Sequence, residues 1–302
     1  MEYDVIINSV LKIIDKRIKE NLKVDELARV ANYSHYHFCR IFTEVTGMSV
    51  SAYITRRKLD YALYDLWSGS KVVDVAFDYG FETHAGFTKA FKKCFGYPPS
   101  LHRLYLQTNK PKPITAADLK YGGMKLEIKI KLLPSLVVAG YASRHEIPGV
   151  NNISDIPAFW DRVNLEYGAA LTTLHDTYAA SQHCEIGICL DIDEEKGYFT
   201  YILGVGVDES DSTVSERPGM YKHKIKGGLY AIFTTALVAE NEYAPSIRET
   251  WKQALNKWLP ESEYEFDETR EAYEYYDERD HYWQTDGKQQ MDICIPLRRI
   301  VD

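Results

Sequence analysis

Hydrophobic residues recur with a helical period in two related stretches of the first hundred residues. In HFCRIFTEVTG (37–47), apolar side chains from Phe38 to Val45 stand at positions i, i+3, i+4 and i+7, which predicts one buried helix face. GFTKAFKKCFG (86–96) repeats the Phe–basic–Phe spacing 49 residues later. Each stretch ends in a glycine, the residue that most often closes a helix in the left-handed conformation.

A second matched piece precedes each of these helices. VDELARVANYS (24–34) resembles VVDVAFDYGFE (72–82), and Ser34 and Thr83 stand where helix N-caps are expected. Each unit is therefore predicted to be a short helix, a tight turn and a second helix. This is helix-turn-helix geometry, present twice.

One long helix is predicted between the two units. SVSAYITRRKLDYALYDLWSG (49–69) runs from a Ser cap to a Gly, and about 19 helical residues span roughly 28 Å. Successive major grooves on one face of double-stranded DNA lie about 34 Å apart, so the two units could enter two successive groove segments. Arg56 and Arg57 on this helix are interpreted either as phosphate contacts or as solvated residues.

The pattern changes after residue 108. QTNKPKPITAADLKYGG (107–123) is rich in Pro, Lys and small polar residues, which indicates a linker. Beyond it, KLEIKIKL (125–132) and SLVVAGY (135–141) are predicted to be paired strands. We expect a helical DNA-binding domain at 1–108, a linker at 109–123 and a second domain at 124–302.

The order of strands and helices in the second domain is expected to repeat. In the first half, a helix at 158–168 is followed by strands at 184–192 and 198–207. In the second half, strands within 220–236 precede a helix at 244–259, and strands at 270–276 and 291–298 follow it. Trp160 and Trp251 occupy matching positions on the two helices. The predicted fold is therefore multidomain, with an all-α first domain and an α+β second domain of two pseudo-symmetric β-β-α-β-β repeats, between which a cleft is expected.

Charge divides the chain in the same place. Residues 1–113 hold 17 Lys and Arg against 12 Asp and Glu, whereas residues 114–302 hold 19 against 32. A basic segment that carries helix-turn-helix units is suited to a polyanion, and the acidic remainder is not.

The remaining composition favours a cytoplasmic protein. The five cysteines form no CxxC pair, so neither a metal site nor a cofactor is expected. The first residues mix charged and apolar side chains, unlike a signal peptide, and no stretch reaches the apolar length of a membrane helix.

Residues 5–107 resemble the AraC/XylS family of transcription regulators. The resemblance lies in the tandem units, the RRKLxxA stretch of the connecting helix, and the tail FxxxxxFTKAFKKxFGYPPSxxR from Phe81 to Arg103. The layout, with this module first, is most similar to the Rob-type members. It implies a DNA-binding regulator for which RNA polymerase is a further candidate partner.

In each helix-turn-helix unit, the outer face of the second helix supplies the candidate DNA contacts. Arginine is suited to bidentate hydrogen bonding with guanine, which favours Arg40. Cys39 stands where Rob-like proteins have a Gln, and His84 and Ala85 stand where the family has a pair of glutamines. For each residue alone the alternative is an ordinary solvated position. The candidates are His35, Tyr36, Cys39, Arg40, Thr43, His84, Ala85, Thr88, Lys89 and Lys92.

Residues 124–301 resemble the GyrI-like effector-binding domain of multidrug regulators. The resemblance lies in WxxxxNKWLP (251–260), in AYEYY, which matches the family's FExY, and in the closing DICIPL strand. It implies a small-molecule site centred on Glu274, because a carboxylate among aromatic rings favours a flat cationic or amphipathic ligand. The alternative is a solvated residue in the acidic stretch 261–280. The candidate ligand residues are Trp160, Trp251, Tyr273, Glu274, Tyr276 and Trp283.

The sequence therefore predicts a DNA-binding transcription regulator that senses a small molecule and is not an enzyme. One alternative is that the second domain hydrolyses its ligand, with Glu274 as general base. Another is a protein-binding inhibitor module.

Overall fold

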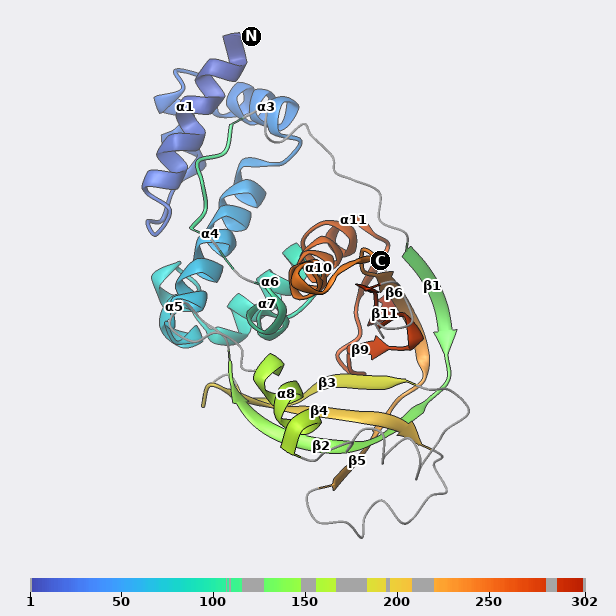
Figure 1. Cartoon of the computed structure of the whole chain (residues 1–302). Helices are drawn as coiled ribbons and strands as arrows, with labels where there is room; N and C mark the ends of the chain where they lie inside the picture. Colours follow the sequence, from blue (N-terminus) through green and yellow to red (C-terminus); the bar gives the residue numbers. More distant parts are fainter. Residues whose placement is uncertain are drawn as a thin grey trace. The chain divides into compact units, whose positions relative to one another are not determined.

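The computed structural model describes residues 2–106, 108, 110–115, 128–147, 156–166, 184–193, 196–207, 220–280 and 287–300. These residues form two compact units, coloured along the chain in Figure 1. The helical unit runs from the N-terminus to Cys94 and includes the described residues of 107–124. The sheet unit consists of Phe95–Leu106 and the described residues from 128 onward. The boundary expected at residue 108 stays a prediction.

The regular secondary structure in the described part of the helical unit consists of helices. Its core is aromatic, since Phe38 packs against Phe42 and Phe42 against Tyr53, with ring centroids 5.7 and 5.5 Å apart. The helices are α1 (Glu2–Lys16), α2 (Val24–Val30), α3 (His35–Thr46), α4 (Val50–Trp67), α5 (Val72–Asp78) and α6 (His84–Phe95).

The helix ends lie where the sequence places them. Ser34 caps α3 and Thr83 caps α6, each hydroxyl accepting a hydrogen bond from the backbone N–H three residues later. Gly47 and Gly96 follow the two helices with left-handed φ angles of 73° and 81°. The predicted caps of both helix-turn-helix units are therefore confirmed.

The two turns are also built alike. Asn32 in the first turn and Gly80 in the second adopt positive φ angles of 59° and 78°. The amide after each of them donates to a carbonyl of the preceding helix, Ala28 at 3.0 Å and Ala76 at 2.9 Å. Asparagine and glycine tolerate this left-handed conformation better than other residues, which explains their use here.

A buried ion pair joins α1 to the connecting helix α4. The Arg57 guanidinium donates two hydrogen bonds to the Asp15 carboxylate, at 2.8 and 2.9 Å, and the two side chains are only 3% and 7% exposed. It also donates to the Lys112 carbonyl at 3.1 Å. Both interpretations of Arg57 drawn from the sequence, a phosphate contact and a solvated residue, are wrong because the side chain is buried.

We expect Arg57→Ala to destabilise the protein by about 3–5 kcal/mol, because it leaves the Asp15 carboxylate buried without a partner. Chemical denaturation measures the change. Arg56→Ala is the matched control: its pair with Asp60 is more exposed and is worth at most about 1 kcal/mol. Equal losses in the two variants would contradict a special role for the buried pair.

A curved antiparallel sheet dominates the sheet unit. Its strand order is β1-β6-β11-β9-β3-β4-β2-β5, with β8 paired to β11, and β7 pairs separately with β10. The α+β fold class is confirmed, whereas the internal repeat stays a prediction. The strands are β1 (Ile128–Leu133), β2 (Leu136–Glu146), β3 (Glu185–Asp193), β4 (Tyr198–Val207), β5 (Met220–Ile225), β6 (Gly228–Thr234), β7 (Val238–Ala239), β8 (Tyr264–Phe266), β9 (Tyr273–Tyr276), β10 (Lys288–Gln289) and β11 (Asp292–Arg299).

The predicted pairing of 125–132 with 135–141 is wrong. β1 pairs with β6 and β2 pairs with β5, and the register continues across the break, with Leu133 opposite Gly228 and Leu136 opposite Ile225. The two strands thus follow one another along a single bent ladder. Gly227 permits this bend, because a Cβ there would lie 2.7 Å from the backbone nitrogen of Ser135.

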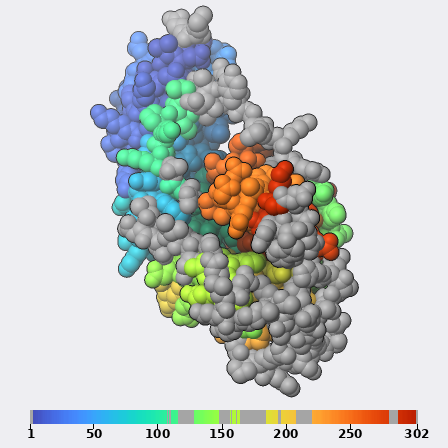
Figure 2. All heavy atoms as spheres, in the orientation of Figure 1, coloured from blue at the N-terminus to red at the C-terminus, as the bar shows by residue number. Residues whose placement is uncertain are grey.

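Helices cover one face of this sheet. The helix α8 (Ile156–Glu166) packs Phe159 and Val163 against Phe199 and Leu203 of β4. A longer helical segment continues without a break from α10 into a π-helical turn, η3, and then α11, and Figure 2 shows the outer side of α10 at the surface. The remaining helical elements of the unit are α7 (Pro99–Tyr105), α10 (Glu240–Gln253), η3 (Ala254–Trp258), α11 (Leu259–Glu261) and η4 (Glu278–Asp280).

Candidate functional sites

The second helix of each helix-turn-helix unit presents a polar outer face. The buried faces of α3 and α6 carry Phe38 and Phe87, so the opposite residues face solvent. Tyr36 is 80% exposed. His35, Tyr36, Arg40, Thr43, His84, Ala85 and Lys89 are exposed, and Cys39, Thr88 and Lys92 are half-buried.

Local contacts hold three of these side chains. The His35 ring is paired with the Asp25 carboxylate of α2, and the Thr88 hydroxyl lies 3.4 Å from the His84 ring nitrogen. Pairing with Asp25 fixes His35 at the start of α3, the end of a recognition helix that most often approaches bases.

The second site centres on the Glu274 carboxylate of β9. It accepts a hydrogen bond from Trp251 Nε1 at 3.1 Å, one from the Tyr276 hydroxyl at 2.9 Å and a longer one from the Tyr201 hydroxyl at 3.4 Å. Trp160 donates in turn to the Tyr201 oxygen at 3.2 Å. All these donors are neutral, and among the described residues no cation pairs with Glu274.

Burial controls the electrostatics of this site. Loss of hydration raises the pKa of Glu274 above the usual range, although the hydrogen bonds from Trp251, Tyr276 and Tyr201 oppose the shift. Burial also raises the pKa values of the Tyr201 and Tyr276 hydroxyls far above normal, so both remain protonated donors. The site therefore holds one titratable acid among neutral aromatic groups.

Gly187 makes room for this arrangement. It lies opposite Glu274 in the β3–β9 ladder, and a Cβ at this position would lie 2.1 Å from the Tyr201 hydroxyl oxygen and 3.1 Å from Glu274 Oε2. Because Tyr201 projects across the backbone of Gly187, any larger residue would push its hydroxyl away from the carboxylate.

Tyr105 of α7 completes the aromatic enclosure. Its ring stacks on Trp251 with centroids 3.7 Å apart and an angle of 11° between the ring planes. Its hydroxyl lies against the Cys189 thiol, whose pKa burial raises to about 12. Trp251 is thus covered by Tyr105 while its indole N–H holds Glu274.

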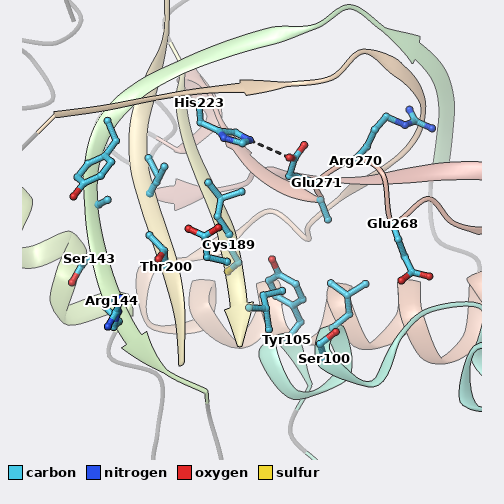
Figure 3. Close-up of a pocket in the computed structure, with 18 of the residues that line it drawn as sticks. Ser100, Tyr105, Ser143, Arg144, Cys189, Thr200, His223, Glu268, Arg270 and Glu271 are labelled. Atoms are coloured by element: carbon cyan, nitrogen blue, oxygen red, sulfur yellow. Dashed lines mark hydrogen bonds and ion pairs between the residues drawn. The ribbon is translucent and has the colours of Figure 1, made fainter. Parts of the chain in front are cut away.

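An open cavity of about 670 Å³ adjoins Tyr105 (Figure 3). The size is typical of small-molecule sites. Tyr105 points into the cavity, which is also lined by Arg144 and by the His223–Glu271 pair, whose side-chain atoms are 3.1 Å apart. Neither Trp251 nor Glu274 lines it.

The structure brings together part of the predicted ligand set. Three of the predicted residues lie around the Glu274 carboxylate: Trp160, Trp251 and Tyr276. The Trp160 and Tyr276 rings lie 4.7 Å apart. Tyr273 does not join them, because neighbouring residues of a strand face opposite ways; it packs in the core on the other face, 5.7 Å from the Tyr230 ring. Trp283 lies outside the described residues.

Several residues of the site were missed from the sequence. The glycine within the apolar strand CEIGICLDI was a usable signal, since a strand glycine often marks a close approach. Tyr201 and Cys189 carried no distinguishing signal. Tyr105 lies within residues 5–107, the stretch interpreted as the DNA-binding module, so nothing pointed to a role in the second site.

Fold and site together define a class: a tandem helix-turn-helix protein joined to an α+β small-molecule-binding domain. The GyrI-like small molecule binding domain matches residues 126–298, and a helix-turn-helix domain matches residues 27–104. The chain belongs to the family of the GyrI-like small molecule binding domain. Both predicted resemblances, to AraC-type regulators and to the GyrI-like domain, are confirmed.

Similar proteins match mainly over the first third of the chain. The uncharacterized HTH-type transcriptional regulator YbfP of Bacillus subtilis is 32% identical over 108 residues, covering 35% of this chain and 37% of that one. The right origin-binding protein of Escherichia coli is 35% identical over 104 residues, covering 34% and 36%. A crystal structure of a putative transcription regulation protein from Staphylococcus aureus covers 58% of this chain and 99% of its own, with 16% identity and a TM-score of 0.42.

We expect Gly187→Ala to destabilise the protein by about 1–3 kcal/mol, because the new methyl group overpacks the site and displaces the Tyr201 hydroxyl. Thermal unfolding measures the change. Gly206→Ala on β4 is the control, because its Cβ would meet mainly the flexible end of Leu136 at 3.2 Å. If the Gly187 variant were as stable as the Gly206 variant, Tyr201 could move away from the new methyl group without loss of stability.

Proposed function

We propose that the protein is a transcription regulator that binds double-stranded DNA through its helical unit and a small aromatic cation through its sheet unit. The observation that carries the first half is the repetition of one helix-turn-helix unit, with the same caps and turn and an exposed second helix each time. The relatives matched over this region are regulators rather than enzymes, which supports a non-enzymatic role.

The connecting helix sets the reach of the two units. The 18 residues of α4 span about 27 Å, close to the rise of one DNA turn. The buried Arg57–Asp15 pair anchors this helix to α1. We infer that α3 and α6 enter two successive major-groove segments on one face of DNA, and that the Lys and Arg side chains of this unit neutralise phosphates.

Arg40 is the residue best suited to read a base. We expect Arg40→Ala to weaken binding to a selected site by about 1–3 kcal/mol and binding to random DNA by less. Titration of fluorescent duplexes at fixed salt measures both. Equal losses on the two duplexes would show that Arg40 contacts phosphate and not a base.

The effector half of the proposal depends on the state of Glu274. A desolvated carboxylate whose partners among the described residues are all neutral donors gains more from a bound cation than a hydrated surface acid does. The stacked rings around it add cation–π and stacking contacts. A flat aromatic cation satisfies both features.

We expect Glu274→Gln to weaken binding of N-methylacridinium at least about tenfold, or roughly 1.4 kcal/mol. Acridine in mildly alkaline buffer has nearly the same shape without the charge and should bind both proteins alike. Calorimetric titration measures the affinities. Glu265→Gln, in the same acidic stretch but outside the cavity lining, is the control; if Glu268→Gln in the cavity wall weakens binding instead, the cation sits in the open cavity and not at Glu274.

Acid should weaken the same binding. Only the ionised carboxylate attracts the cation, and its raised pKa means that protonation begins at a higher pH than for an ordinary glutamate. Affinity is therefore expected to be full above that raised pKa and to fall as the pH drops through it. Other titratable groups at the site include the Cys189 thiol and the Tyr201 hydroxyl, and burial raises the pKa of both. The pH dependence should vanish in Glu274→Gln, and its persistence there would assign it to another group.

A further inference from the structure

We infer that Tyr105 is a built-in occupant of the effector site, which an aromatic cation must replace on Trp251 in order to reach Glu274. The inference rests on the proposed effector function and adds the way in which that site is regulated. It assigns a regulatory role to α7, a helix that lies between the two parts of the chain in sequence.

Several contacts dock the segment Phe95–Leu106 in the sheet unit. The Tyr97 hydroxyl donates to Asn256 Oδ1 at 2.9 Å, and the Gly96 carbonyl accepts from the Phe266 amide at 2.8 Å. The helix α7 then carries Tyr105 onto Trp251. Defined contacts with the sheet unit therefore occur along the whole segment. The stack of Tyr105 on Trp251 lies at its C-terminal end.

Tyr105 separates the open cavity from the carboxylate. One side of it lines the 670 Å³ cavity, whereas its ring covers Trp251, which is only 2% exposed. Trp251 in turn holds Glu274. A ligand that enters the cavity therefore meets Tyr105 before it meets the acid.

Tyr105 makes the stacking contact that the site provides, but it does not pair with the acid. Its ring provides the stack on Trp251, but a phenol supplies no positive charge; burial raises the pKa of its hydroxyl far above normal, so the group stays neutral. A flat cation provides both the stack and the charge. The exchange is therefore favourable for this ligand class and unfavourable for a neutral ring of the same shape.

The exchange connects ligand binding to the DNA-binding half. The helix-turn-helix match extends to residue 104, so α7 belongs to that domain by sequence while its contacts lie in the sheet unit. Only a few residues separate it from the recognition helix α6. A ligand that displaces Tyr105 releases this segment. Its apparent affinity equals the intrinsic affinity multiplied by the fraction of molecules in which Tyr105 has left the stack.

Removal of the side chain tests the competition. In full-length protein, Tyr105→Ala should tighten N-methylacridinium binding about tenfold, because no occupant has to leave. Tyr105→Phe keeps the stacking ring and should bind like the wild type. Tyr221→Ala, which removes another tyrosine from the cavity wall, is the matched control and should also change little. Unchanged or weaker binding by Tyr105→Ala would overturn the inference, because Tyr105 would then be a wall of the site.

Hydrogen exchange of the unaltered protein gives a second measurement. Amides of 101–105 should exchange faster at saturating N-methylacridinium, and unchanged or slower exchange contradicts displacement of α7. Glu274→Gln separates this inference from the proposed function. If that variant binds the cation as well as the wild type, the effector site itself is wrong; if it binds weakly while Tyr105→Ala does not bind tightly, only the role of Tyr105 is wrong.

Discussion

A buried acid that no cation pairs with in the described part of the chain, placed among aromatic rings, organises the sheet unit. Removing an ionised carboxylate from water costs several kcal/mol unless its oxygens receive hydrogen bonds. Here three separate elements contribute: Trp251 comes from α10, Tyr201 from β4 and Tyr276 from β9. The absence of a side chain at Gly187 is part of the same requirement. The unit thus keeps a desolvated carboxyl group with a raised pKa in place, which is a feature expected of a functional site more than of a core.

The helical unit could be predicted nearly in full because its signals are local. A helix cap, a left-handed turn residue and a 3.6-residue period each depend on neighbours within a few positions. Ser34, Gly47 and Gly96 show this, since each acts within its own turn of chain. The exception is Arg57, whose partner Asp15 is 42 residues away, so that neither its burial nor its pairing could be derived from the pattern.

The sheet unit shows where such reasoning ends. Strand positions could be predicted from alternation, but the partner of a strand is decided by contacts far along the chain. For this reason β1 was wrongly paired with β2, when it lies against β6. The site follows the same division: Glu274 was found through the family resemblance, whereas Tyr201 and Tyr105 reach it only through tertiary packing.

The long-range strand pairing also determines the order in which the two units can fold during synthesis. Most of the helical unit lies within the first 94 residues, and its other described residues end at 115, so its local contacts allow rapid folding early in synthesis. The sheet has to wait, because β6 needs β11, which ends at Arg299, and β1 pairs with a strand about 100 residues downstream. During that interval α7 has emerged while Trp251 has not. The newly made chain therefore passes through a stage in which the DNA-binding half is already folded and Tyr105 has no site to occupy.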